Sequence, residues 1–100
     1  MDFEWNERKR ANNLAKHGVD FVRACRVWEE NDRIVVIEDT RRDYREARFQ
    51  AFGFVDGVLL MVAFTWRGKS CRIISARRAS KDEREAYDAC IGQAGARDQG

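Results

Sequence analysis

The segment that most constrains the fold is residues 58–66, because nearly all of its side chains are apolar and both faces of a strand formed there need cover. Asp56-Gly57 comes directly before it, and this dipeptide is typical of a two-residue turn between antiparallel strands. We therefore expect 58–66 to be the central strand of an antiparallel sheet. Helices should cover one of its faces, and another element must cover at least part of the second.

Three further runs are rich in β-branched and aromatic side chains and are expected to form strands: 33–38, 47–54 and 71–78. Arg67-Gly68-Lys69 is a second hairpin signal, between the last two strands, whereas the charged segment 39–46 is a longer connection between the first two. The pattern predicts a four-stranded antiparallel sheet.

Two helices are expected before the sheet. The first covers 7–17, with Asn6 as its N-cap and Gly18 as a left-handed exit. Its expected buried stripe is Ala11, Leu14 and Ala15. Asp20 is a plausible cap for the second helix, and its apolar positions follow helical spacing: Phe21, Ala24, Cys25 and Trp28.

A third helix should follow the sheet. Ser80 and Glu83 form a capping box, which predicts a helix to about Ile91. Its expected buried side consists of Tyr87, Cys90 and Ile91. The fold class is therefore α+β, with one domain over residues 1–92 and a flexible C-terminal tail over 93–100.

The composition fits one small domain, since 100 residues with 44% hydrophobic content can build a single core. A net charge of +2 is too small to identify a nucleic-acid binder. The charges are unevenly distributed, because 67–81 is basic whereas 29–39 and 82–88 carry clusters of acidic residues. Such polarity suits a protein with two different partners.

The chain has three widely spaced cysteines and one histidine, which supports neither a zinc site nor a disulfide framework. We expect no metal and no cofactor. The reduced thiols indicate the cytoplasm. The longest apolar run, 58–64, is far too short to span a membrane, and the acidic, aromatic start is not a signal peptide.

The basic segment contains six cations and no acidic residue: Arg67, Lys69, Arg72, Arg77, Arg78 and Lys81. Arginine binds phosphate oxygens in pairs, so several arginines on a rigid strand favour a polyanionic partner such as nucleic acid. The alternative is a solvated edge strand whose charges block aggregation.

The order of residues along nearly the whole chain resembles the BrnT toxins of bacterial type II toxin–antitoxin systems. The blocks that carry the likeness are Phe3-x-Trp5, Lys16-His17-Gly18-Val19, Glu46-x-Arg48, Asp56-Gly57-x-Leu59-Leu60, Arg72-Ile73-Ile74-Ser75-Ala76-Arg77 and Glu83-Arg84-x2-Tyr87. The family's usual Trp-Asp near the start is Trp5-Asn6 here. Many members have a histidine and a glycine where this chain has Arg42 and Arg45, so no role at those positions carries over.

The resemblance implies a RelE-like fold and a metal-independent endoribonuclease that cleaves RNA and halts translation. It also implies a BrnA-like antitoxin that binds and neutralises the toxin. The antitoxin would supply a ribbon-helix-helix unit, so operator DNA would be contacted only through it.

Metal-free RNA cleavage needs a base for the 2′-hydroxyl, stabilisation of negative charge and an acid for the leaving group. Arg67, Arg72 and Arg77 are the candidates for holding the phosphate. Regular alternation would place Arg72 and Arg77 on opposite faces of their strand. Either a bulge intervenes or only one of the two is catalytic.

Glu46 and His17 are alternative general bases. Nearby arginines would favour the ionised form of Glu46 and weaken it as a base, and it could equally serve as an arginine partner that holds its loop. Histidine titrates near neutral pH, yet His17 stands at a helix end, where imidazolium often only stabilises the helix.

Five further residues are candidates for RNA binding: Lys16, Arg48, Trp66, Lys69 and Arg78. Trp66 could stack on an unpaired base, or it could be core, since it shares a strand face with Phe64. A non-catalytic nucleic-acid-binding module and a protein that docks an acidic partner remain alternatives to a ribonuclease.

Overall fold

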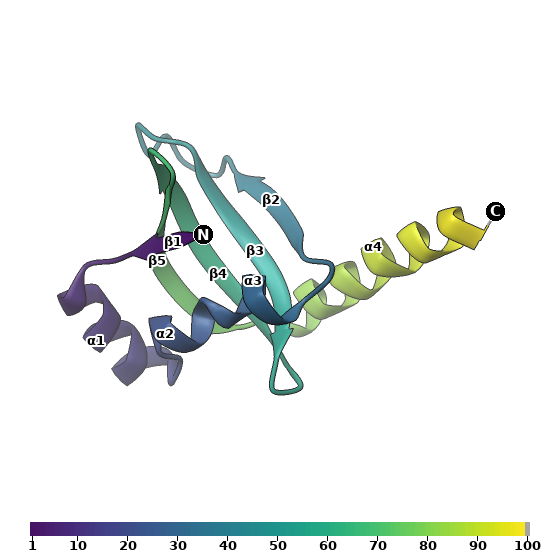
Figure 1. The fold of residues 1–100 in the computed structure, drawn as a ribbon, viewed down its shortest axis with the longest axis horizontal. Coiled ribbons are helices and arrows are strands. Elements are labelled where there is room, and N and C mark those ends of the chain that lie inside the picture. Colours follow the sequence, from purple (N-terminus) through teal and green to yellow (C-terminus); the bar gives the residue numbers. More distant parts are fainter. Residues whose placement is uncertain (100) are drawn as a thin grey trace.

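The computed structural model describes residues 1–99, with side chains for residues 1–92, and its central strand is the expected one. β4 (Val58–Arg67) pairs antiparallel with both β3 (Arg48–Val55) and β5 (Ser70–Arg78), and β2 (Val35–Asp39) pairs antiparallel with β3 (Figure 1). Asp56 and Gly57 both have positive φ, 51° and 77°, as a tight hairpin turn of this kind requires. The antiparallel arrangement of these strands is confirmed.

The sheet has five strands, so the expectation of four was wrong. β1 (Asp2–Glu4) pairs in parallel with the first residues of β5, which gives the order β1-β5-β4-β3-β2. A strand of three residues is too short to show a recognisable alternation in the sequence. Its position is fixed by pairing with residues far along the chain.

α1 (Glu7–His17) has the expected ends, since the Asn6 side chain accepts the backbone N–H of Lys9 and Gly18 has a φ of 71°. The second expected helix is divided at Cys25 into α2 (Phe21–Ala24) and α3 (Arg26–Glu30). There the N–H of Trp28 bonds the carbonyl of Cys25, three residues back, which tightens the turn. Phe21, Ala24 and Cys25 of the expected apolar face are buried across the break, whereas Trp28 is partly buried and packs against the core.

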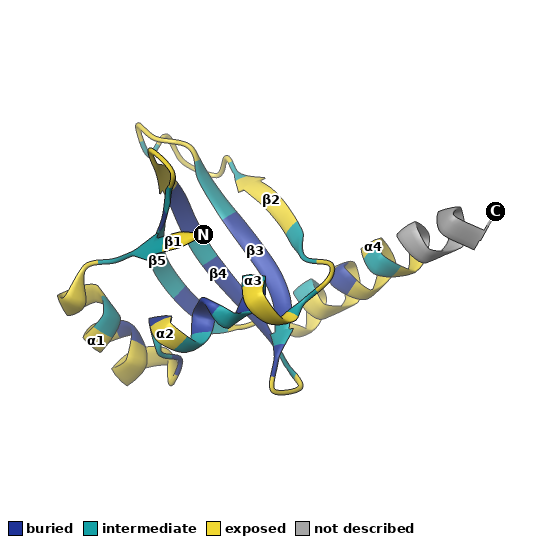
Figure 2. Ribbon diagram, in the orientation of Figure 1, coloured by how far each residue is buried: buried dark blue, intermediate teal, exposed yellow. Residues whose placement is uncertain are grey.

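Helices lie on both faces of the sheet. α2 and α3 cover one face, and the buried residues there include Phe21, Val27, Leu60, Val62 and Ile73. α4 (Lys81–Gln99) packs on part of the other face, where Tyr87 contacts a cluster containing Phe52 and Met61. Figure 2 shows the deeply buried parts of β3 and β4, and Figure 1 shows α3 crossing the sheet while α4 runs away from it toward the C-terminus. α4 is therefore the element that covers part of the second apolar face of β4, as expected from the sequence.

α4 also runs past its expected end near Ile91. The expected flexible tail over 93–100 lies outside the residues whose side chains are described, and its mobility stays a prediction. Cys90 is exposed, so its expected place in the core was wrong, whereas Cys25 and Cys71 are buried.

α1 does not bury its expected stripe, because Leu14 is 45% exposed and the buried residue is Asn13. The helix lies at the edge of the sheet beside the second half of β5, where β1 has ended. The Asn13 amide donates to the carbonyls of Val19 and Ala76, at 2.9 and 2.8 Å, and its oxygen accepts the N–H of Ala76 at 3.1 Å. The Asn13 side chain thus satisfies the backbone of Ala76 as a neighbouring strand would, and it holds α1 beside β5.

Gly53 in β3 allows the close approach of α3. A Cβ added there would lie 2.8 Å from Cγ1 of Val27 and 3.0 Å from Nδ2 of Asn31. We expect Gly53→Ala to lower the free energy of unfolding by about 2 kcal/mol through overpacking, as measured by urea denaturation. Gly92→Ala, whose Cβ would meet nothing within 4 Å, is the matched control and should not destabilise the protein. Equal stability of the two variants would contradict this account of the contact.

Candidate ribonuclease site

A β-bulge brings the strand arginines to one face of the sheet. Ser75 pairs with Ala63, but Ile73 pairs with the next residue of β4, Phe64, so β5 carries one extra residue between them. Arg72 and Arg77 consequently pair with Thr65 and Met61, which share the face that α4 covers in part. The first of the two alternatives is correct, and a bulge intervenes. We call this side of the sheet the α4 face.

Arg67, two residues after Thr65 in β4, also belongs to the α4 face. Within residues 1–92 its side chain makes no hydrogen bond or ion pair. Lys69 lies in the adjoining turn between β4 and β5. These two cations therefore stand at the hairpin end of the face, apart from the hollow described below.

The other two strand arginines, Arg72 and Arg77, each form an ion pair with a carboxylate. Arg77 donates from Nη1 and Nη2 to the two carboxylate oxygens of Glu83, at 2.7 and 3.0 Å, and its guanidinium holds the pKa of Glu83 below the usual value. Glu83 also accepts the N–H of Ser80, which confirms the capping box. Arg72 donates to Glu4 at 2.6 Å. A phosphate that bound these arginines would take the place of a carboxylate of similar geometry.

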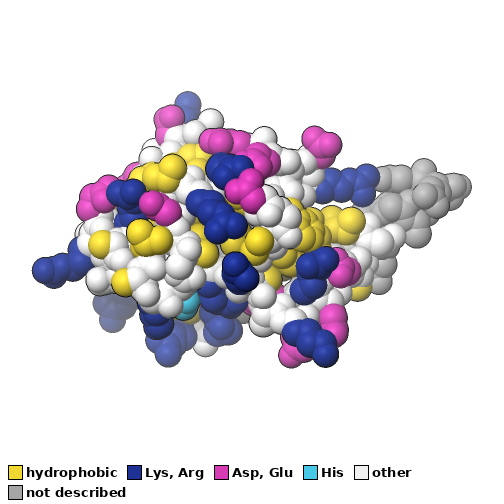
Figure 3. All heavy atoms as spheres, turned by 90° about the horizontal axis from the view of Figure 1, so that it is seen from below, with side chains coloured by type: hydrophobic (Ala, Val, Ile, Leu, Met, Phe, Trp, Pro, Cys, Tyr) yellow, Lys and Arg dark blue, Asp and Glu magenta, His cyan; other side chains and the backbone are white. Residues whose placement is uncertain are grey.

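A basic hollow of about 740 Å³ lies beside this face, where the connection after β2 approaches α1 and β5. Its lining residues are Lys16, Arg41, Arg42, Tyr44, Arg48 and Ser75. The lining contains four cations and no acidic side chain, so it can neutralise a polyanion. Seen from below in Figure 3, lysine and arginine side chains gather on the lower left of the surface, whereas elsewhere they alternate with acidic ones.

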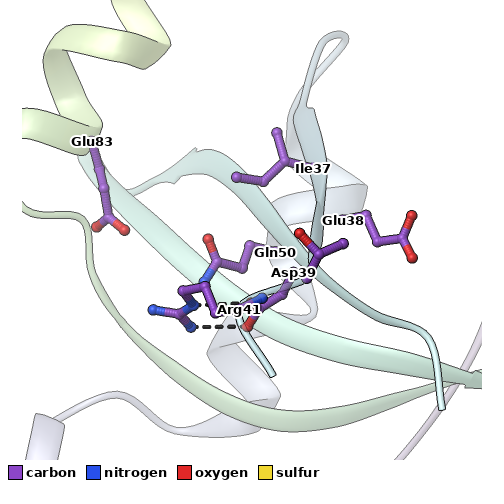
Figure 4. A pocket seen from close by; sticks show the side chains of 7 residues that line it. Ile37, Glu38, Asp39, Arg41, Gln50 and Glu83 are labelled. Carbon is purple, nitrogen blue, oxygen red and sulfur yellow. Dashed lines mark hydrogen bonds and ion pairs between the residues drawn. The ribbon is translucent and has the colours of Figure 1, made fainter. Parts of the chain in front are cut away.

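Neighbouring side chains fix two of the hollow's arginines. The guanidinium of Arg48 lies over the ring of Tyr44, with its Cζ 4.2 Å from the ring centroid, and its Nε donates to Glu46 at 3.3 Å. Arg41 is bound by Asp39, as the dashed lines in Figure 4 show. Both guanidinium groups are therefore held before any ligand arrives.

His17 lines a second hollow, which shares Lys16 and Ser75 with the basic hollow and also includes Lys9 and Asn12. The two hollows form one path along the junction of α1 and β5. Glu46 lines neither hollow. It is paired with Arg48, which agrees with the alternative that Glu46 is an arginine partner holding its loop rather than a base. The structure thus places His17, but not Glu46, on this path.

Two RNA-binding candidates lie on the opposite side of the sheet. Trp66 packs edge-on against Phe64, at a centroid distance of 5.7 Å, and is 47% exposed on the face that carries α2 and α3. Arg78 pairs with Leu60 and so faces the same way. Neither can join the strand arginines in one site.

Sequence reasoning missed four lining residues of the basic hollow: Arg41, Arg42, Tyr44 and Ser75. Of the arginines in 41–48, the sequence indicates only Arg48 as an RNA-binding residue, and the resemblance carries no role over to Arg42. The number of arginines in so short a connection was the available signal, but the approach of this connection to α1 is a tertiary contact.

Among residues 1–92, no group of three or more His, Cys, Asp or Glu side chains could hold a metal ion. No helix in the described part of the chain is both long and apolar enough to cross a membrane. Burial raises the pKa of the Cys71 thiol to about 12 and that of Cys25 to about 11, so neither is a ready nucleophile.

Five carboxyl groups in the described part of the chain have a lowered pKa. In Glu7 the largest cause is a hydrogen bond from Trp5. In the other four the pKa is lowered chiefly by hydrogen bonds from an arginine: Asp20 from Arg10, Asp39 from Arg41, Asp56 from Arg26, and Glu83 from Arg77. A carboxyl group whose pKa is lower in the folded than in the unfolded protein stabilises the fold at pH values above its unfolded pKa. That stabilisation is lost as the pH falls through the folded value.

We therefore expect the melting temperature to stay level from neutral pH to about 5 and to fall below about pH 4, where unfolded carboxylates titrate. Thermal melts across this range, followed by circular dichroism, check the expectation. Asp56→Asn removes one of the five groups and should show a smaller fall. A melting temperature that rises on acidification would contradict the argument.

The family model described as "Ribonuclease toxin, BrnT, of type II toxin-antitoxin system" matches residues 5–83. The matched region runs from the residues before α1 to the first turn of α4, and it includes the basic hollow and the bulged strand. A search among curated proteins found no match to the chain.

Proposed function

Because the chain belongs to the BrnT family of ribonuclease toxins from type II toxin–antitoxin systems, we propose that it is a metal-independent endoribonuclease that inhibits translation in the cytoplasm. The observation that supports this best is the basic hollow, in which four cations and no acidic residue surround one cavity. RNA phosphates would bind there and on the adjacent α4 face.

In the proposed reaction, the ribose 2′-hydroxyl attacks the neighbouring phosphorus and the 5′-oxygen leaves. Arginines stabilise the charge that develops on the phosphate oxygens. Arg77 has the geometry for this role, because its two terminal nitrogens already bind a planar carboxylate, and a phosphate would replace Glu83 there. His17 is the better-placed base or acid, since it shares the path of Lys16, whereas Glu46 is bound to Arg48.

We propose further that a BrnA-like antitoxin covers this path with acidic side chains and carries the ribbon-helix-helix unit that contacts operator DNA. Apolar surface for such a partner lies at the edge strand β2, where Val36 and Ile37 are 45% and 49% exposed. The apolar side chains of β4 from Leu59 to Val62, together with Phe64, do not form that surface, because they are buried. RNA and antitoxin should then compete for the toxin.

Binding of single-stranded RNA by a cleavage-deficient variant should weaken steeply with salt, because each neutralised phosphate releases counterions. In that background, Arg42→Gln should reduce the slope of log affinity against log salt by about one. Arg78→Gln makes the same change on the opposite face and is the matched control, which should leave the slope unchanged. An effect of Arg78→Gln as large as that of Arg42→Gln would place the RNA elsewhere.

One observation favours a second candidate, a non-catalytic RNA-binding module. Arg72 and Arg77 are each bound by a carboxylate, as purely structural arginines would be. Incubation of the purified protein with RNA, with and without ribosomes, separates the two functions. Salt-dependent binding without strand scission would select the second.

A further inference from the structure

The Asp39 carboxylate is the centre of the contacts that order the basic hollow. Its side chain is only 8% exposed, although it stands near the end of an edge strand. It accepts hydrogen bonds from Nε and Nη2 of Arg41, at 2.9 and 2.8 Å, and from the Arg41 backbone N–H at 3.2 Å. Its fourth donor is the hydroxyl of Tyr44, at 3.1 Å. Asp39 thus fixes Arg41 and the connection that follows it.

Tyr44 transmits this constraint to a second cation. The hydroxyl of Tyr44 is held by Asp39, while its ring supports the guanidinium of Arg48 at 4.2 Å. The two arginines that depend on Asp39 come from the connection after β2 and from β3, and both line the basic hollow. One carboxylate therefore sets the positions of half of the hollow's cations.

Charge alone gives no reason for a carboxylate beside the hollow, because a negative charge there opposes the binding of phosphates. A role in geometry explains it, since charge stabilisation in a transition state depends on donors held in place beforehand. On the basis of the proposed ribonuclease function, we propose that Asp39 is a positioning residue that holds Arg41, and through Tyr44 also Arg48, for transition-state stabilisation.

The test is Asp39→Asn, which keeps the shape of the side chain and removes its charge. Positioning predicts that kcat for cleavage of a short RNA falls at least tenfold, while KM is unchanged or lower because the hollow has become more positive. Tyr44→Phe keeps the ring under Arg48 and loses only the bond to Asp39, so it should give a smaller fall in kcat. Asp39→Glu restores the carboxylate and should recover part of the activity.

Glu38→Gln is the matched control, because it removes the same charge from the neighbouring position. Glu38 points to the other face of β2, and Figure 4 shows it directed away from Arg41. Its kcat should equal that of the wild type. A wild-type kcat in Asp39→Asn, or an equal fall in Glu38→Gln, would overturn the proposal.

A second readout does not need cleavage. In the free wild-type protein the Nε–H of Arg41 should exchange slowly with water in NMR spectra, and Asp39→Asn should accelerate this exchange at least tenfold. Unchanged exchange would overturn the positioning role. If the wild type cleaves no RNA, the proposed function fails, while this measurement still decides whether Asp39 holds the arginine.

Discussion

Replacing Arg77 with alanine should abolish growth inhibition while the protein still melts cooperatively. The bulge in β5 puts Arg77 on the α4 face, and its paired nitrogens can hold two oxygens of a phosphate. Removing one donor of transition-state charge costs about 3 kcal/mol, or about a hundredfold in rate. Growth of cells expressing the variant and the single-turnover rate of RNA cleavage measure the effect. Arg67→Ala and Arg72→Ala should act in the same direction.

Glu83→Gln is the control that separates catalysis from packing. It breaks the same ion pair but leaves Arg77 in place, and glutamine can still cap α4. If Arg77 were only structural, the two variants would lose stability together and retain the same activity. We expect Arg77→Ala to be inactive and Glu83→Gln to remain toxic. A fully toxic Arg77→Ala protein would remove Arg77 from the site.

Replacing Asn13 with leucine should lower the free energy of unfolding by about 4 kcal/mol, because it leaves buried backbone groups of Val19 and Ala76 without partners. Leucine has a similar size, so the loss comes from three hydrogen bonds rather than from a cavity. Urea denaturation measures it. Asn12→Leu, at the exposed neighbouring position, should change the stability by less than about 0.5 kcal/mol. An equal effect of the two substitutions would show that Asn13 does not hold α1 to β5.

Features set by neighbouring residues were predictable from the sequence. The caps Asn6 and Gly18, the turn at Asp56-Gly57 and the capping box of Ser80 with Glu83 all have the expected geometry. In each, a side chain or a glycine satisfies the backbone within a few residues. Local chemistry decides such features, so the sequence pattern was sufficient.

Features that depend on distant contacts were not predictable. β1 is a strand only because Phe3 and its neighbours meet β5, and α1 packs through a polar residue because it borders a strand edge. The bulge that aligns Arg72 with Arg77 has no glycine or other clear mark in the sequence. Trp66 was correctly assigned to the face of Phe64, but that face proved to be the one opposite Arg72 and Arg77.

We propose above that the chain cleaves RNA without a metal by attack of a 2′-hydroxyl. The most direct test incubates the purified protein with an RNA oligonucleotide in excess EDTA, beside the same oligonucleotide carrying a 2′-deoxy sugar at the cleaved position. We expect undiminished cleavage of the first, products that end in a 2′,3′-cyclic phosphate, and no cleavage of the second at that position. Cleavage that needs added magnesium, or that proceeds equally at the 2′-deoxy sugar, would contradict the proposal.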